Sequence, residues 1–195
     1  MRGYAVVDVE TTGFHPNHGE IAEIAIVHTD LKGNVTETWD TLVRPRGRMA
    51  GTNVHRITAS MVRSAPSFDE IAHEVRTRLT GRVAVAHNLP FDARFLTAQL
   101  DRVELPAPQV SSGVCTLKLA RRQLRGPSFK LEHCCDELGI PLSGAHAALA
   151  DTLATASLLQ HLISWQGAPS GETVPALSVP APRHPIRVLS RAAPA

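Results

Sequence analysis

The chain has 195 residues, of which 43% are hydrophobic and 19% charged, and its formal net charge is +2. This size and apolar content fit one domain that folds without a metal or disulfide, and no uninterrupted apolar run is long enough to cross a membrane. Because the three cysteines fit neither a disulfide framework nor a zinc site, and no signal peptide is recognisable, we expect a cytoplasmic protein with buried, reduced thiols.

Three extended segments open the predicted fold. Residues Gly3–Val9, Glu20–His28 and Val35–Val43 are predicted strands, and Asp30–Asn34 has the composition of a hairpin turn between the last two. We therefore expect an antiparallel meander at the start of the domain.

From about residue 67 the pattern changes to helices that alternate with short apolar strands. Ser67-Phe-Asp-Glu70 is typical of a capping box, so we expect a helix from there to about Thr80. The expected elements that follow are a strand at Val83–Ala86, a helix from Pro90 to about Leu100, a short strand near Val114, helices at Thr116–Arg125 and Leu131–Leu138, and a last helix from Ala147 to about Trp165. This alternation predicts an α/β domain in which helices cover a sheet.

The composition changes again after residue 166. Residues 167–195 contain six of the fourteen prolines and no aromatic residue, which predicts a disordered tail or tether. We expect one folded domain over residues 1–166. Its bases and acids balance, so binding to nucleic acid cannot be inferred from its overall charge.

Two carboxylates follow the apolar start of the first predicted strand. Asp8 and Glu10 come directly after Ala5-Val6-Val7, and residues i and i+2 of a strand point to the same side, about 6.6 Å apart along the chain. Two like charges on one side repel each other unless a cation lies between them. An Asp-x-Glu pair can also simply begin a turn, here Thr11-Thr12-Gly13, so the pair alone leaves both interpretations open.

Two further acids lie on predicted helices without a base at helical pairing distance. Asp92 is in the first turn of its helix, where the helix dipole favours an acid, but it shares an apolar face with Phe95 and Leu96. Asp151 is predicted in a helix interior, where aspartate is unfavourable, and no Lys or Arg occurs from Leu131 to Pro182. A buried carboxylate of this kind needs a divalent cation or a distant base to compensate its charge.

His146 is a candidate partner of these acids. It precedes Asp151 by five residues, which on one helix would place the two side chains roughly 140° apart. We therefore expect His146 on a loop that enters the last helix, with Asp151 held as a ligand; a solvated or capping histidine is the alternative. Carboxylate clusters offer hard oxygen ligands, which favour Mg²⁺ or Mn²⁺ over Zn²⁺.

Together these segments resemble the DEDDh exonuclease superfamily, the class that contains the proofreading ε subunit of bacterial DNA polymerase III. The segment Val6-Val7-Asp8-Val9-Glu10-Thr11-Thr12-Gly13-Phe14 is similar to the first family motif, Ala86-His87-Asn88-Leu89-Pro90-Phe91-Asp92-Ala93-Arg94-Phe95-Leu96 to the second, and His146-Ala-Ala-Leu-Ala-Asp151 to the third. The motifs occur in the family's order, and the similarity covers about residues 4–165. Relatives often carry an arginine after the third-motif histidine, where this chain has Ala147.

The resemblance implies a fold and a division of roles. The fold would be a ribonuclease-H-like α/β domain, with a mixed five-stranded sheet flanked by helices. Two Mg²⁺ or Mn²⁺ ions would be held by four carboxylates: Asp8, Glu10, Asp92 and Asp151. His146 would accept the proton of the attacking water. The terminal nucleotide would be contacted by residues of the first two motifs: Thr11, Thr12, Phe14 and Asn88. Phe14 has the alternative role of a core aromatic residue.

The activity implied by the resemblance is hydrolysis of phosphodiester bonds by a metal-dependent 3′→5′ exonuclease. Its substrates would be single-stranded or frayed 3′ ends, with DNA favoured over RNA, and a DNA polymerase is a candidate partner. An exoribonuclease and a non-catalytic nucleic-acid-binding module on the same fold are the alternatives. The presence of all four acids and the histidine favours an enzyme, because binding alone needs none of them.

Basic residues and loop histidines complete the set of candidates. Four bases recur at helical spacing and form either a path for phosphates or a plain solvated face: Lys118, Arg121, Arg122 and Arg125. The same alternatives hold for a second basic stretch: Arg44, Arg46 and Arg48. We expect His15 and His18 to be exposed loop residues rather than metal ligands.

Overall fold

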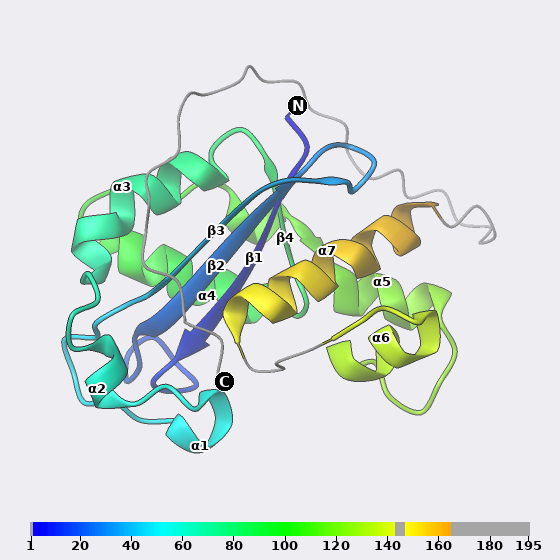
Figure 1. The fold of residues 1–195 in the computed structure, drawn as a ribbon. Helices are drawn as coiled ribbons and strands as arrows, with labels where there is room; N and C mark the ends of the chain where they lie inside the picture. The colour runs from blue at the N-terminus through cyan, green and yellow to red at the C-terminus, as the bar shows by residue number, and fades with distance from the viewer. Residues whose placement is uncertain (1, 143–146, 165–195) are drawn as a thin grey trace.

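β1 (Tyr4–Thr11) is the central strand of a five-stranded sheet in the computed structural model, which describes residues 2–142 and 147–164 (Figure 1). On one side it pairs antiparallel with β2 (Ile21–Thr29), which pairs antiparallel with β3 (Val35–Leu42). On the other side β1 pairs parallel with β4 (Val83–Ala86), and β4 pairs parallel with β5 (Val114–Cys115). This order, β3-β2-β1-β4-β5, confirms the predicted meander and the mixed sheet.

Helices connect the strands and cover the sheet. The long helices are α3 (Phe68–Leu79), α4 (Leu89–Asp101), α5 (Thr116–Gln123), α6 (Leu131–Leu138) and α7 (Ala148–Ser164). Three short elements were not predicted, because they are too brief to show a helical period: α1 (Thr52–His55), α2 (Ala59–Val62) and a 3₁₀ turn at Val110–Ser112.

The side chains of β1 alternate between two cores on opposite faces of the sheet. Ala5, Val7 and Val9 pack in the larger core with residues of α3 and α4, whereas Tyr4 and Val6 pack in the core beneath α7. Figure 1 shows α7 lying across this second face, and α7 contacts both β1 and β2. Because the alternation continues along the strand, the next two residues of this second face are acidic.

The predicted turn and cap signals are confirmed. The Ser67 N–H donates to Glu70 Oε2 at 2.7 Å, which closes the capping box of α3. The Asp30 N–H donates to the Asn34 carbonyl oxygen at 2.9 Å, which closes the hairpin turn between β2 and β3. The helix predicted to reach Arg125 ends at Gln123. Pro127 follows shortly after, and a proline disfavours helical backbone in the residue that precedes it.

The three cysteines are buried and unpaired, as expected. Cys134 and Cys135 pack with Leu158 of α7, and burial raises the pKa of both thiols, so they belong to the core. Among the described residues, no helix combines the length and apolar character needed to span a bilayer. The tail predicted over residues 167–195 lies outside the described residues.

Candidate functional site

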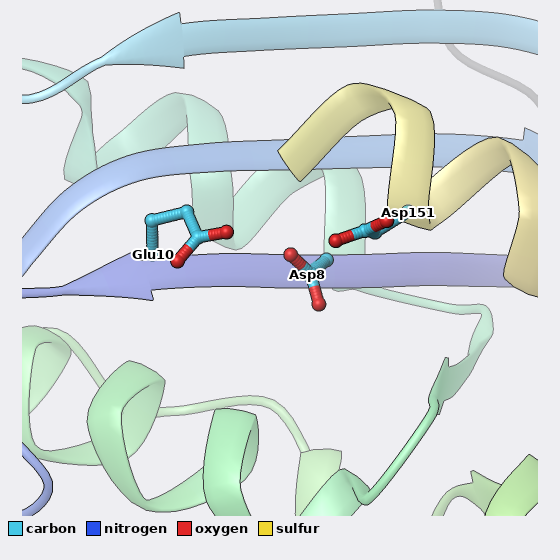
Figure 2. A group of neighbouring side chains, drawn as sticks. All are labelled: Asp8, Glu10 and Asp151. Atoms are coloured by element: carbon cyan, nitrogen blue, oxygen red, sulfur yellow. The ribbon is translucent and has the colours of Figure 1, made fainter. Parts of the chain in front are cut away.

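Three carboxylates meet on the α7 face of the sheet. Asp8 and Glu10 come from β1 and Asp151 from α7, and one carboxylate oxygen of each lies within 4.8 Å of the others. Figure 2 shows Asp8 between Glu10 and Asp151, with the Asp151 carboxylate reaching from the helix toward Asp8. The predicted strand end at Val9 is too early, because β1 continues to Thr11 and carries both acids. The interpretation that they only begin a turn is therefore excluded.

The position of Asp151 differs from the expected one. It lies in the first turn of α7, where the helix dipole favours an acid, and its side chain is only partly buried. The argument that Asp151 is an unfavourable residue in a helix interior is therefore wrong. Its place in the site follows instead from the packing of α7 on β1 and β2, which brings the start of the helix to the carboxyl half of β1.

Asp92 approaches β1 from α4 and is only 3% exposed. The Val9 N–H donates to Asp92 Oδ1 at 3.2 Å, so this carboxylate is held against the backbone between Asp8 and Glu10. Burial raises the pKa of Asp92 to about 8, although the hydrogen bond from Val9 acts in the opposite direction. Asp92 is not part of the three-residue group, but its charge acts on Asp8.

Electrostatic repulsion is concentrated on Asp8. Burial raises its pKa well above the usual range, and the negative charges of Asp92, Glu10, Asp151 and Glu23 raise it further, in that order of importance. A hard divalent cation binds to such a set of oxygen ligands, and its charge would offset the repulsion. The carboxylates therefore fit a hard divalent cation.

Glu23 is a buried acid that sequence reasoning missed. It lies on β2 opposite Glu10, is 3% exposed, and accepts a hydrogen bond of 3.2 Å from the N–H of Ala148, the first residue of α7. It therefore holds the start of the helix that carries Asp151. The signal was present in the sequence, because Glu23 is the only acid in the apolar run Ile21–Val27.

We expect Glu23→Ala to lower kcat/KM for the hydrolysis that the sequence motifs imply about tenfold, because a buried N–H without its acceptor costs about 1–3 kcal/mol and frees the start of α7. Glu23→Gln keeps an acceptor oxygen and should stay within about threefold of the wild type. Steady-state kinetics on both variants, with circular dichroism melts as the folding control, checks this. An equal loss in both variants would show that the charge of Glu23, and not its hydrogen bond, matters.

The candidate substrate residues lie at the carboxyl ends of β1 and β4. Thr11 Oγ1 donates to the Gly13 carbonyl at 2.7 Å, and Thr12 Oγ1 accepts from the Glu20 N–H at 3.0 Å. Phe14 is 86% exposed, which excludes its alternative role as a core aromatic residue. Asn88 is exposed and has a φ of 84°, a left-handed conformation that asparagine tolerates, so backbone geometry gives a second reason for its presence.

Two of the remaining basic candidates form ion pairs with α3. Arg46 contacts Asp69 at 2.6 Å and Arg44 contacts Glu70 at 3.6 Å, so this stretch pairs with the first turn of α3. The other bases and the loop histidines are exposed: Arg48, Lys118, Arg121, Arg122, Arg125, His15 and His18. The predicted base His146 lies outside the described residues.

Sequence comparison defines the class to which this fold and acidic site belong. The family described as Exonuclease, of RNase T type, matches residues 5–159. The chain therefore belongs to the exonuclease family, within the DEDDh 3′→5′ superfamily.

Individual relatives carry the names of DNA polymerase III proteins. The chain is 37% identical over 169 residues to a DNA polymerase III subunit epsilon-like protein of Rhodobacter capsulatus, a match that covers 82% of this chain and 23% of that protein. It is 30% identical over 165 residues to the PolC-type DNA polymerase III of Thermotoga petrophila, covering 82% of this chain and 12% of that protein. The chain thus spans less than a quarter of the length of these relatives.

Solved structures confirm the ribonuclease-H-like fold. Exonuclease X in complex with 5′ overhanging duplex DNA matches with a TM-score of 0.65 and 28% identity, over 88% of this chain and 95% of that chain. E. coli exonuclease I in complex with a dT13 oligonucleotide matches with a TM-score of 0.73 and 22% identity, over 83% of this chain and 41% of that chain.

Proposed function

We propose that this chain is a metal-dependent 3′→5′ exonuclease that hydrolyses single-stranded or frayed DNA ends. The observation that carries the proposal is the group of Asp8, Glu10 and Asp151 carboxylates within 4.8 Å of one another, in a domain of the exonuclease family. DNA as the substrate is supported by the DNA complex of exonuclease X and by the polymerase relatives, whose names also support a DNA polymerase as a partner.

We propose that the acidic residues hold two Mg²⁺ or Mn²⁺ ions: Asp8, Glu10, Asp92 and Asp151. When bound, such ions lower the pKa of an attacking water and offset the negative charge that grows on the phosphate oxygens. Asp8 is the candidate for the shared ligand, since its carboxylate lies between those of Glu10 and Asp151 (Figure 2). Asp92 has to lose its proton to bind a cation. Because its pKa is raised, a cation competes with a proton for this carboxylate.

The chain's own residues supply the remaining steps of the proposed mechanism. His146 accepts the proton of the attacking water, since a neutral imidazole is available near pH 7; this role rests on the third sequence motif alone. The ring of Phe14 stacks on the terminal base, which suits an enzyme without sequence preference. Further contacts to the terminal nucleotide come from Thr11, Thr12 and Asn88.

Digestion of a 5′-labelled single-stranded DNA and of the RNA with the same sequence tests the proposal. With Mg²⁺ or Mn²⁺ we expect a ladder that shortens from the 3′ end, and with EDTA no digestion. A substrate whose 3′ end is blocked by an inverted terminal nucleotide serves as the control for direction. Internal cuts, or shortening from the 5′ end, would contradict the proposal, and faster digestion of the RNA would overturn the assignment of DNA.

Phe14→Ala is expected to raise KM for single-stranded DNA about tenfold with little change in kcat. The reason is that stacking of one base on an aromatic ring contributes about 1–3 kcal/mol to binding, and the Phe14 side chain is exposed, so its removal should not disturb the core. Phe14→Tyr keeps the ring and should behave like the wild type. Initial rates over a range of DNA concentrations separate KM from kcat, and an unchanged KM in Phe14→Ala would rule out the stacking role.

A further inference from the structure

Arg94 of α4 and Arg102, the residue that follows α4, contact the loop that carries Phe14. Arg94 Nη2 donates to the carbonyl oxygen of Phe14 at 2.8 Å, and Arg102 Nη2 donates to the carbonyl oxygen of Pro16 at 2.6 Å. Arg102 also pairs with Glu20, at the end of the same loop, at 3.3 Å. Residues 12–20, here called the Phe14 loop, are thus attached at three points to α4 and the residue that follows it.

The Phe14 loop is also closed on itself. The Thr12 N–H donates to the Glu20 carbonyl at 2.9 Å, and the Glu20 N–H donates to Thr12 Oγ1 at 3.0 Å. Gly13 and Gly19 lie so close that a Cβ on Gly19 would be 2.8 Å from the Gly13 nitrogen. Hydrogen bonds close the two ends of the loop, and arginines contact it nearer the tip. The loop therefore has little conformational freedom, so little conformational entropy is lost when a ligand binds to it.

Arg94 is itself held in place. Its guanidinium lies 4.7 Å from the centre of the Phe91 ring, within the range of a cation–π contact, so fewer rotamers are open to it than to an ordinary surface arginine. The same helix carries Asp92, whose carboxylate is bound to the backbone of β1. One helix therefore carries an acidic residue of the site and also contacts the backbone of Phe14.

We propose that Arg94 and Arg102 are positioning residues that hold the Phe14 ring at a fixed place relative to the acidic cluster, so that it receives the base of a 3′-terminal nucleotide. The ligand is a nucleic-acid end with an unpaired terminal base. This inference rests on the proposed function, but it concerns binding and can be measured without hydrolysis. Neither arginine needs to touch the substrate, because each acts through the Phe14 loop.

A double-mutant cycle separates this indirect role from direct contact with phosphate. The protein is the full chain carrying Asp8→Asn, which prevents digestion, and the readout is Kd for a 5′-labelled single-stranded DNA by fluorescence anisotropy. We expect Phe14→Ala to raise Kd about tenfold and Arg94→Ala about threefold to tenfold. The variant with both changes should bind no more weakly than Phe14→Ala alone, since Arg94 then has no ring to position.

Matched variants control for the charge of Arg94 and for the loss of an arginine–carbonyl contact elsewhere in the fold. Arg94→Lys keeps the positive charge near Asp92 but loses the planar contact with Phe91, so its Kd should resemble that of Arg94→Ala. Arg102→Ala should also raise Kd and should also lose its effect in the Phe14→Ala background. Arg76→Ala removes a similar contact, from Arg76 Nε to the Pro106 carbonyl at 3.2 Å, beside the amino end of β4, and should leave Kd unchanged.

A DNA whose 3′-terminal nucleotide lacks its base gives an independent readout. Asp8→Asn without a second substitution should bind this DNA as weakly as its Phe14→Ala variant binds the complete DNA. Adding Arg94→Ala should not raise Kd for this DNA further. Multiplicative effects of Arg94→Ala and Phe14→Ala would overturn the proposal, since they would mean that Arg94 contacts the nucleic acid directly. An unchanged Kd in Phe14→Ala would overturn it as well, while leaving digestion by the wild-type chain, and so the proposed function, intact.

Discussion

Asp8→Asn is expected to reduce kcat for 3′-end hydrolysis by about 10³-fold or more, and at the same time to stabilise the metal-free protein. The loss follows because Asp8 is the central carboxylate of the cluster and a bound cation contributes several kcal/mol to hydrolysis. The gain in stability follows because burial and four neighbouring acids oppose a negative charge at position 8, and an amide carries none. A residue that matters only for folding would not show these opposite changes.

Two measurements on the same samples check this prediction. Single-turnover digestion of a labelled DNA strand gives the rate, and thermal unfolding in EDTA gives the stability. Asp40→Asn is the matched control, because burial also raises the pKa of Asp40, but Asp40 is not among the acids that act on Asp8. If Asp8→Asn lowered the melting temperature in EDTA, the repulsion argument would be wrong, and if it retained wild-type rates, so would the assignment of the site.

The raised pKa of Asp92 should lower the stability of the metal-free protein as the pH rises from about 4 to about 8, and a divalent cation should reverse this loss. Unfolded aspartate releases its proton near pH 4, whereas Asp92 keeps it up to about pH 8 in the folded state. The folded state therefore binds more protons in this window, and the free energy of unfolding falls as the pH rises. Since each pKa unit corresponds to about 1.4 kcal/mol, the expected loss is a few kcal/mol.

Urea unfolding at several pH values, in EDTA and in Mg²⁺, measures this effect. Mg²⁺ binds the ionised carboxylates, so its stabilisation should be larger at pH 8 than at pH 5. Asp92→Asn supplies the comparison, because a residue that does not titrate should flatten the dependence of the metal-free protein on pH. The same dependence on pH in Asp92→Asn and in the unsubstituted protein, both in EDTA, would contradict the prediction, because the lowered pKa values of His28 and His87 act equally in both proteins.

The sequence predicted the sheet, and the side of the strand on which two acids lie, where a local pattern sufficed. The i, i+2 spacing of Asp8 and Glu10 placed both on one side of a strand, and the capping box at Ser67 located the start of α3. The resemblance to the exonuclease superfamily also gave the right family and fold. Each of these inferences depends on only a few consecutive residues or on an ordered set of motifs.

The inferences that failed depended on packing between distant segments. Glu23 was overlooked because its partner, the N–H of Ala148, lies 125 positions away in the chain. The surroundings of Asp151 were misread because a helix start cannot be located to the residue from composition alone. The contacts of Arg94 and Arg102 with the Phe14 loop join residues 80 and 86 positions apart, and no local spacing indicates them.

The two-residue alternation of side chains along β1 also limits which insertions and deletions the strand can accept. The apolar residues that form both cores and the acids that form the site share one strand with a two-residue period. Inserting or deleting a single residue between Ala5 and Asp8 would turn both carboxylates into the apolar core beneath α3 and α4. A length change in this strand would thus remove the site and disturb the fold together, whereas the Phe14 loop, which follows the strand, can vary in length without changing which way the acids face.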